Sequence, residues 1–235
     1  TALAEQSLVG CVVLVSQGGE LVYRRAAGLA DRESGRVLRE DDLFRLASLT
    51  KPMVSVTALR LVCDGVLRLD DPVSRWLPDF RPALADGRVP EITVHHLLTH
   101  TAGLSYGFTE RAVSAYERAG VSDGLDQPGL SLAENLRRIA SVPLGYPPGE
   151  GWSYSVALDV LSGVMQAASG ATLPELVARH VTEPLGMADT AFHCVDVARL
   201  VTPYQDNPAP HGGPPLRMGE LAEVRLGQGI GRITP

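Results

Sequence analysis

Residues 44–51 read Phe-Arg-Leu-Ala-Ser-Leu-Thr-Lys, with a serine and a lysine three positions apart. Apolar residues recur at helical spacing from Met53 to Val62 and are followed by Gly65, so this stretch is predicted to open a buried helix. Side chains three positions apart on a helix share one face. We therefore expect the Ser48 hydroxyl and the Lys51 amine to lie within hydrogen-bonding reach of each other.

The residue types of this pair suit a serine nucleophile and its base. A serine hydroxyl attacks poorly until a base takes its proton, and a neutral lysine amine can serve as that base. Lys51 is the single lysine beside 20 arginines, which favours a role that requires loss of a proton, because arginine effectively never loses one. The alternative is structural: Ser48 caps the helix, and Lys51 is a solvated residue of its first turn.

A second candidate lies in Gly151-Trp152-Ser153-Tyr154-Ser155, between a Pro-Pro-Gly turn and a helix predicted from Ala157. A tyrosine at such a junction presents its hydroxyl to a neighbouring group. Tyr154 is therefore a candidate proton relay for Ser48 and Lys51. The alternative is a half-buried tyrosine whose hydroxyl is satisfied locally.

The rest of the chain predicts an α+β fold. Strands over 9–15 and 20–27, joined by a turn at 18–19, form a hairpin, and the middle of the chain is mostly helical, with capping patterns at Ser131 and Thr172. Because an isolated hairpin is marginally stable in water, we expect further strands from a longer parent protein or from a second polypeptide. The expected parts are residues 1–70 with the hairpin and the nucleophile helix, 71–200 as a helical domain, and 201–235 as a truncated return segment.

Several segments together resemble the serine β-lactamase and penicillin-binding-protein family, particularly class C β-lactamases and the family VIII carboxylesterases. The resemblance implies an antiparallel sheet flanked by helices and packed against a helical domain. It also implies that Ser48 is acylated, that Lys51 and Tyr154 share the acid–base work, and that the acyl-enzyme is then hydrolysed. The segments are the N-terminal hairpin, residues 44–51, Leu69-Asp70-Asp71-Pro72-Val73, His96-Leu97-Leu98-Thr99-His100-Thr101-Ala102-Gly103-Leu104, Pro148-Gly149, Tyr154-Ser155 and Pro184-Leu185-Gly186-Met187.

Two departures from the family pattern bear on the reaction. Class C β-lactamases carry Tyr-x-Asn at the second motif, but this chain has Val156 at the third position, and valine cannot hydrogen-bond a substrate amide. This resembles the esterase branch. The third motif, which in the family supplies half of the oxyanion hole, has no credible match, since His211-Gly212-Gly213 fits the letters but lies too early and in a proline-rich stretch. The loss of one such donor costs roughly 2.7–4 kcal/mol in other serine hydrolases.

The preferred prediction is a serine carboxylesterase that cleaves short-chain esters through acyl-Ser48, with Tyr106 and Trp152 as walls of the pocket. A β-lactamase or D-Ala-D-Ala peptidase that takes a β-lactam or peptide substrate is the alternative within the fold. A non-catalytic binding protein of the same fold is the alternative from another class.

Two further patterns compete with this prediction. Gly103-Leu104-Ser105-Tyr106-Gly107 fits the nucleophile elbow of α/β-hydrolases, which would make Ser105 the nucleophile, but that elbow needs a strand before it. His96 and His100 have the i, i+4 spacing of zinc ligands on one helix, but no third ligand is evident. A structural role for these histidines is favoured, and we expect neither a metal ion nor another cofactor.

Composition excludes several function classes. The 235 residues carry a formal charge of −6 without a long basic run, so nucleic acid is not an expected partner. The apolar stretches are far shorter than the ~20 residues of a membrane span. Three cysteines at wide spacing, Cys11, Cys63 and Cys194, argue against a disulfide framework, and together with the lack of a visible signal peptide they favour a cytoplasmic location.

Overall fold

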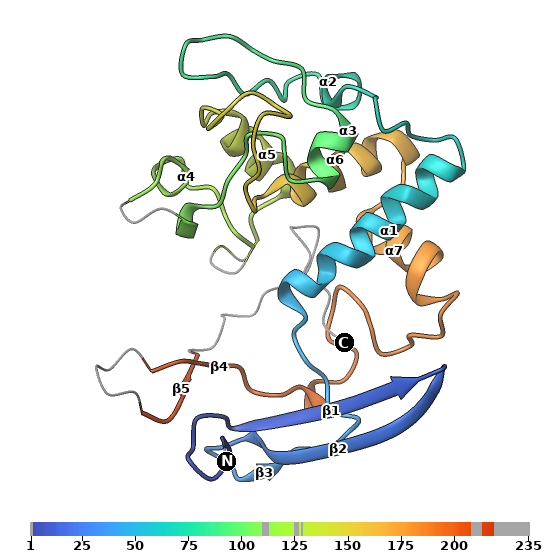
Figure 1. Ribbon diagram of the computed structural model, residues 1–235, viewed down its shortest axis with the longest axis vertical. Coiled ribbons are helices and arrows are strands. Elements are labelled where there is room, and N and C mark those ends of the chain that lie inside the picture. The colour runs from blue at the N-terminus through green and yellow to red at the C-terminus, as the bar shows by residue number, and fades with distance from the viewer. Residues whose placement is uncertain (1, 110–112, 125–126, 128, 208–212, 219–235) are drawn as a thin grey trace.

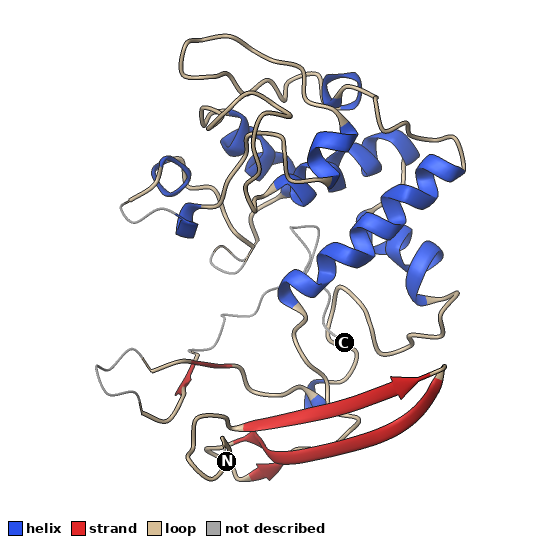
Figure 2. Cartoon of the chain, viewed as in Figure 1, coloured by secondary structure: helices blue, strands red, loops and turns tan. Residues whose placement is uncertain are grey.

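The computed structural model describes residues 2–109, 113–124, 127, 129–207 and 213–218. Figure 1 shows a sheet at one end of the molecule, a group of helices at the other, and one long helix, α1 (Thr50–Cys63), between them. Figure 2 shows the same division between strands and helices. The structure thus has the α+β architecture that the sequence predicts.

The sheet begins with a long antiparallel hairpin. β1 (Gly10–Gln17) pairs with β2 (Glu20–Asp31), and the turn residues Gly18 and Gly19 have φ angles of 61° and 86°. Glycine adopts these left-handed angles without steric cost, which is why the chain turns here. The predicted strands are confirmed, although β2 is four residues longer because it also pairs with β3 (Arg36–Val37).

Few other strands accompany the hairpin in the described residues. β4 (Tyr204–Gln205) and β5 (Leu216–Arg217) form a separate two-stranded ladder. Near the hairpin turn, side chains of successive residues point to opposite faces of the sheet. Val13, Leu14 and Val15 are nevertheless all 43–59% exposed. Both faces of this part of the hairpin therefore carry accessible apolar surface within the described structure.

The hydrophobic core lies among the helices and is centred on α6 (Ala157–Ser169). Residues such as Val160, Leu161 and Val164 on α6 are fully buried. The neighbours that pack on α6 are α1, α2 (Val73–Trp76), α3 (Val94–Leu98), α5 (Leu132–Ala140) and α7 (Leu173–Val177). The remaining helical segments are a 3₁₀ turn at Gly107–Thr109, α4 (Ala115–Arg118), a π-helical turn at Ala178–Thr182 and a 3₁₀ turn at Val197–Arg199.

The predicted helix starts are confirmed at two capping residues. The Thr172 hydroxyl accepts a hydrogen bond from the Glu175 backbone N–H, and the Glu175 carboxylate accepts one from Thr172 in return. The Ser131 hydroxyl likewise accepts from the backbone N–H of Glu134. The Glu134 carboxylate, however, pairs with two arginines of α5, so a full capping box does not form there. Each capping hydroxyl thus binds a backbone N–H that has no acceptor within the helix.

The alternative in which Ser48 caps the helix is wrong. A 3₁₀ turn, Ala47–Leu49, precedes α1, and Leu49 rather than Ser48 occupies the N-cap position of α1. Ser48 therefore does not cap the helix, and its hydroxyl is available for other partners. The three cysteines are unpaired, as their spacing predicts.

Candidate active site

Ser48, Lys51 and Tyr154 meet at one end of α1. The Tyr154 Oη donates to the Ser48 Oγ at 2.6 Å, and the Lys51 Nζ lies 3.4 Å from the same oxygen. The proximity of Ser48 and Lys51 agrees with their spacing along the helix. Tyr154 comes from the loop before α6, 106 positions away in the sequence. The serine oxygen is therefore approached by two groups that are able to exchange protons.

The backbone before α1 presents Ser48 outward. Ala47 has a left-handed φ of 46°, and the Leu49 N–H donates to the Leu46 carbonyl to close a tight turn. A non-glycine residue in this region costs about 1–2 kcal/mol, so the packing of α1 has to hold the turn in place. Ser48 is exposed in consequence, whereas Lys51 is half-buried.

The loop that carries Tyr154 is fastened to the segment after α3. The Gly149 N–H donates to the Thr101 carbonyl at 2.9 Å, and the Ser153 N–H donates to the His100 carbonyl at 3.1 Å. On the far side of Tyr154, the Val156 N–H donates to the Ser105 carbonyl at 3.3 Å. Backbone bonds thus hold the loop before and after Tyr154.

Tyr154 belongs to a row of five aromatic rings. Phe108 stacks on Tyr106 with centroids 4.7 Å apart, and Tyr106 lies 5.3 Å from Tyr154. On the other side, the His100 ring lies 5.2 Å from Tyr154 and 6.3 Å from Trp152. Phe108 and Trp152 at the two ends are 61% and 67% exposed, whereas Tyr106 is 5% exposed. The row therefore has exposed ends, whereas Tyr106 is buried and Tyr154 and His100 are partly buried.

The two sequence-predicted pocket walls hold different places in this row. Tyr106 contacts the Tyr154 ring directly, and the Lys51 Nζ lies 5.4 Å from the Tyr106 centroid and 4.8 Å from that of Tyr154. Trp152 reaches the row only through His100. Lys51 thus faces two aromatic rings and a hydroxyl, and it forms no ion pair within the described part of the chain.

The prediction that His96 and His100 share one helix is wrong. α3 ends at Leu98, and His100 has a left-handed φ of 57°. His96 is structural, because its Nδ1 accepts from the Thr93 backbone N–H in a capping box. Burial and the neighbouring charge of Lys51 lower the pKa of His100. No group of three metal-ligating side chains is present among the residues that the structure describes.

The structure does not give Ser105 the setting of a nucleophile elbow. Residues 99–106 form turns and loop rather than a strand. The Ser105 Oγ hydrogen-bonds to the Thr109 hydroxyl at 2.9 Å, and its backbone N–H donates to the Tyr116 Oη. Ser105 is therefore part of the loop scaffold.

The two departures from the family pattern also have places in the structure. Val156 is 1% exposed and belongs to the hydrophobic core, so its side chain supplies no group to the surface around Ser48. The stretch 211–213, which fits only the letters of the third motif, falls largely outside the described residues, since only Gly213 is described.

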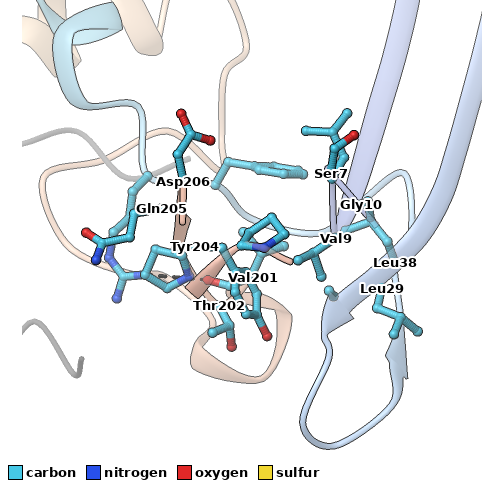
Figure 3. A pocket seen from close by; sticks show the side chains of 16 residues that line it. Ser7, Val9, Gly10, Leu29, Leu38, Val201, Thr202, Tyr204, Gln205 and Asp206 are labelled. Carbon is cyan, nitrogen blue, oxygen red and sulfur yellow. Dashed lines mark hydrogen bonds between the residues drawn. The ribbon is translucent and has the colours of Figure 1, made fainter. Parts of the chain in front are cut away.

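A cavity of about 280 Å³ lies away from these residues, between the hairpin and the segment 201–206 (Figure 3). Its lining includes Gly10, Leu29 and Leu38 from the sheet side and Thr202 and Tyr204 opposite them. None of Ser48, Lys51 and Tyr154 lines it. This cavity is therefore not part of the candidate active site.

Sequence reasoning missed His100, Ser155 and Phe108 as members of the site. For His100 the sequence favoured a structural role over metal binding, but it did not connect this residue with the loop that carries Tyr154. The His100 Nδ1 hydrogen-bonds to the Ser155 Oγ at 3.0 Å. The position of Ser155 next to Tyr154 was a signal that it belongs to the site. Nothing in the sequence indicated that its partner is a histidine 55 positions away.

The fold and the serine–lysine–tyrosine cluster are those of a β-lactamase-type protein, and the chain matches the Beta-lactamase family over residues 1–231. The chain therefore belongs to the β-lactamase family. It is 54% identical over 231 residues to Esterase EstB of Burkholderia gladioli, which covers 98% of this chain and 58% of EstB. Penicillin-binding protein 4* of Bacillus subtilis (strain 168) is 30% identical, over 81% of this chain and 40% of that protein.

Solved structures support the same fold. The structure of EstCE1, described as a hydrolase with promiscuous acyltransferase activity, matches with a TM-score of 0.86 and 39% identity over 99% of this chain and 60% of EstCE1. The chain thus spans 58% of EstB, 60% of EstCE1 and 40% of penicillin-binding protein 4*. No helix in the described ranges has the length and apolar character needed to cross a membrane.

Proposed function

We propose that the protein is a serine hydrolase that cleaves short-chain carboxylic esters through an acyl-enzyme on Ser48. The observation that carries the proposal is the contact of one serine oxygen with both the Tyr154 Oη at 2.6 Å and the Lys51 Nζ at 3.4 Å. A nucleophile with a base in hydrogen-bonding reach is the signature of covalent catalysis. The names of EstB and EstCE1, an esterase and a hydrolase, support the choice of reaction.

In the proposed acylation step, the Ser48 Oγ attacks the ester carbonyl carbon while neutral Lys51 accepts the serine proton. The Ser48 backbone N–H supports the oxyanion of the tetrahedral intermediate. The bond between the carbonyl carbon and the leaving oxygen then breaks, and the Tyr154 hydroxyl gives its proton to the departing alkoxide. Lys51 returns a proton to the Tyr154 phenolate. The products are an alcohol and acyl-Ser48.

Deacylation repeats the sequence with water in place of the alcohol. A water molecule attacks the acyl carbon, and its proton passes to Lys51 through the same groups. Breakage of the bond to the Ser48 Oγ returns the proton to serine and releases a carboxylic acid. No metal or organic cofactor enters this scheme.

Esters rank ahead of β-lactams and peptides because of the second motif. Val156 is buried and apolar, so no side-chain amide at this position holds a substrate amide. The similarity to penicillin-binding protein 4* keeps β-lactam or D-Ala-D-Ala peptide cleavage as the alternative within the fold. A non-catalytic binding protein is the alternative from another class.

The test compares turnover of p-nitrophenyl butyrate with turnover of a chromogenic cephalosporin by the purified full-length protein. We expect ester turnover to dominate and to be abolished by Ser48→Ala. Dominant cephalosporin turnover would favour the β-lactamase alternative. Turnover that is unchanged in the Ser48→Ala variant would overturn the assignment of the nucleophile, and a lack of any turnover or acylation burst would favour a binding protein.

A further inference from the structure

His100 holds the residues on both sides of Tyr154. Its backbone carbonyl accepts the Ser153 N–H at 3.1 Å. Its ring Nδ1 hydrogen-bonds to the Ser155 Oγ at 3.0 Å. One residue therefore fixes the chain immediately before and immediately after the tyrosine.

The His100 ring also limits the orientation of the Tyr154 ring. The two centroids are 5.2 Å apart with an interplanar angle of 39°, and Tyr106 packs on Tyr154 at 5.3 Å and 40°. Tyr154 thus has two ring neighbours in the loop that follows α3, and rotation of its side chain would break these contacts. The 2.6 Å bond to Ser48 depends on that orientation.

The bond from His100 ends on a buried hydroxyl at the start of α6. Ser155 is 1% exposed, and its Oγ also accepts the Ala157 N–H at 3.3 Å, at the start of α6. The loss of one hydrogen bond by a buried hydroxyl is unfavourable. The loop therefore has a strong preference for the arrangement in which the His100 ring faces Ser155.

The backbone of His100 shows that the residue is held in an unusual conformation. Its φ of 57° lies in the left-handed region, which an ordinary L residue enters at a cost. Asparagine and glycine tolerate that region better than most residues. The surrounding contacts keep His100 there, with its ring over the tyrosine loop rather than turned to solvent.

We propose that His100 is a positioning residue that holds the Tyr154 hydroxyl on Ser48 through its bond to Ser155 and its ring contact with Tyr154. This inference rests on the proposed function, since it concerns the proton relay of that reaction. His100 is not assigned a proton-transfer step, because no hydrogen bond joins its ring to Ser48 or Lys51 in the described part of the chain. Misplacement of a reacting group by about 1 Å can cost about 100-fold in rate.

The experiment uses the purified full-length protein and ethyl butyrate, whose leaving alkoxide needs a proton, and it compares His100→Gly with His100→Asn. Glycine accepts the backbone angle but removes the ring and its bond. Asparagine accepts the angle and keeps a polar atom near the position of Nδ1. We expect His100→Gly to lower kcat about 10- to 100-fold with KM within about twofold, and His100→Asn to recover most of the lost kcat. The matched control is His95→Ala, which removes an exposed imidazole five positions earlier and should leave kcat within about twofold.

A double-variant comparison tests the route through Ser155. Ser155→Ala removes the same hydrogen bond from the other side, so the His100→Gly/Ser155→Ala protein should be nearly as active as the worse of the two single variants. Full additivity of the two losses would overturn the proposed route. A kcat for His100→Gly within twofold of the wild-type value would overturn the proposal, and so would a His100→Asn protein that unfolds at the wild-type temperature but is as slow as His100→Gly.

Ser48→Ala and Tyr154→Phe, measured alongside, separate this inference from the proposed function. If both abolish or strongly lower turnover while His100→Gly does not, only the positioning role fails. If Ser48→Ala or Tyr154→Phe retains full turnover, the proposed function fails and the positioning role fails with it.

Discussion

Replacement of Tyr154 by phenylalanine removes one oxygen atom from the centre of the site and leaves the ring in place. In the wild-type protein this oxygen donates a hydrogen bond to the Ser48 Oγ at 2.6 Å. In the variant, the Lys51 Nζ, 3.4 Å from the Ser48 Oγ, is the remaining proton-transfer group beside the serine. General acid–base catalysis by a positioned side chain contributes about 10²- to 10⁴-fold. Each factor of ten corresponds to 1.36 kcal/mol, so the barrier should rise by about 2.7–5.4 kcal/mol.

A comparison of two leaving groups tests the proton relay specifically. p-Nitrophenolate departs without protonation, whereas an alkoxide has to receive a proton as it leaves. A proton relay at Tyr154 therefore predicts a larger loss of kcat/KM with an ethyl ester than with a p-nitrophenyl ester of the same acid. The assay measures both substrates for the wild-type and Tyr154→Phe proteins, with thermal unfolding as the check that the ring contacts persist. An equal loss for both esters, or a loss below threefold for the ethyl ester, would refute the relay.

Three further predictions follow from the structure. Lys51→Arg keeps the positive charge, but a guanidinium effectively never loses its proton and cannot act as the base. The kcat for an ester should therefore fall at least about 100-fold, while the thermal midpoint stays close to that of the wild type. Gly103→Ala should lower the urea unfolding free energy by about 1–3 kcal/mol, because Gly103 has a φ of 80° and a Cβ there would collide with the Tyr146 carbonyl oxygen; an unchanged urea midpoint would contradict this. Hydrogen bonds from two arginines of α5 lower the pKa of Glu134 to about 2, so its contribution to stability is complete above the ordinary pKa of 4.5 and is lost as the pH falls toward 2. As the pH is lowered from 6 to 2, the thermal midpoint should therefore fall less steeply for Glu134→Gln than for the wild type. Parallel curves of thermal midpoint against pH would contradict the assignment.

The spacing of residues predicted the part of the site that lies within one helix. Ser48 and Lys51 are three positions apart, and local geometry alone brings their side chains together. The contact with Tyr154 depends on how the loop before α6 packs against the end of α3, which no local rule specifies. The junction between a Pro-Pro-Gly turn and a helix made Tyr154 a candidate, and the family resemblance added its acid–base role beside Ser48 and Lys51.

The error at His100 has a physical cause. The pattern from His96 to His100 continues the helical spacing, and neither glycine nor proline marks an end between them. The chain nevertheless leaves the helix after Leu98, because His100 takes a left-handed conformation that its tertiary contacts with Ser153 and Ser155 support. Tertiary contacts of this kind override local propensity.

The strands show the same limit. The long hairpin was predictable because a Gly-Gly turn separates two apolar runs. β4 and β5 were not predicted, since each has only two residues and their pairing joins positions on either side of residues 208–212. Pairing that short leaves almost no periodic pattern in the sequence.

The most direct test of the central claim is intact mass spectrometry of the purified protein before and after treatment with a fluorophosphonate probe, with Ser48→Ala as the control. An activated serine reacts with this probe, so the account predicts one adduct on the wild-type protein, located at Ser48 by peptide mapping, and none on the variant. An unlabelled wild-type protein, or equal labelling of the Ser48→Ala variant, would contradict the assignment of Ser48 as the nucleophile.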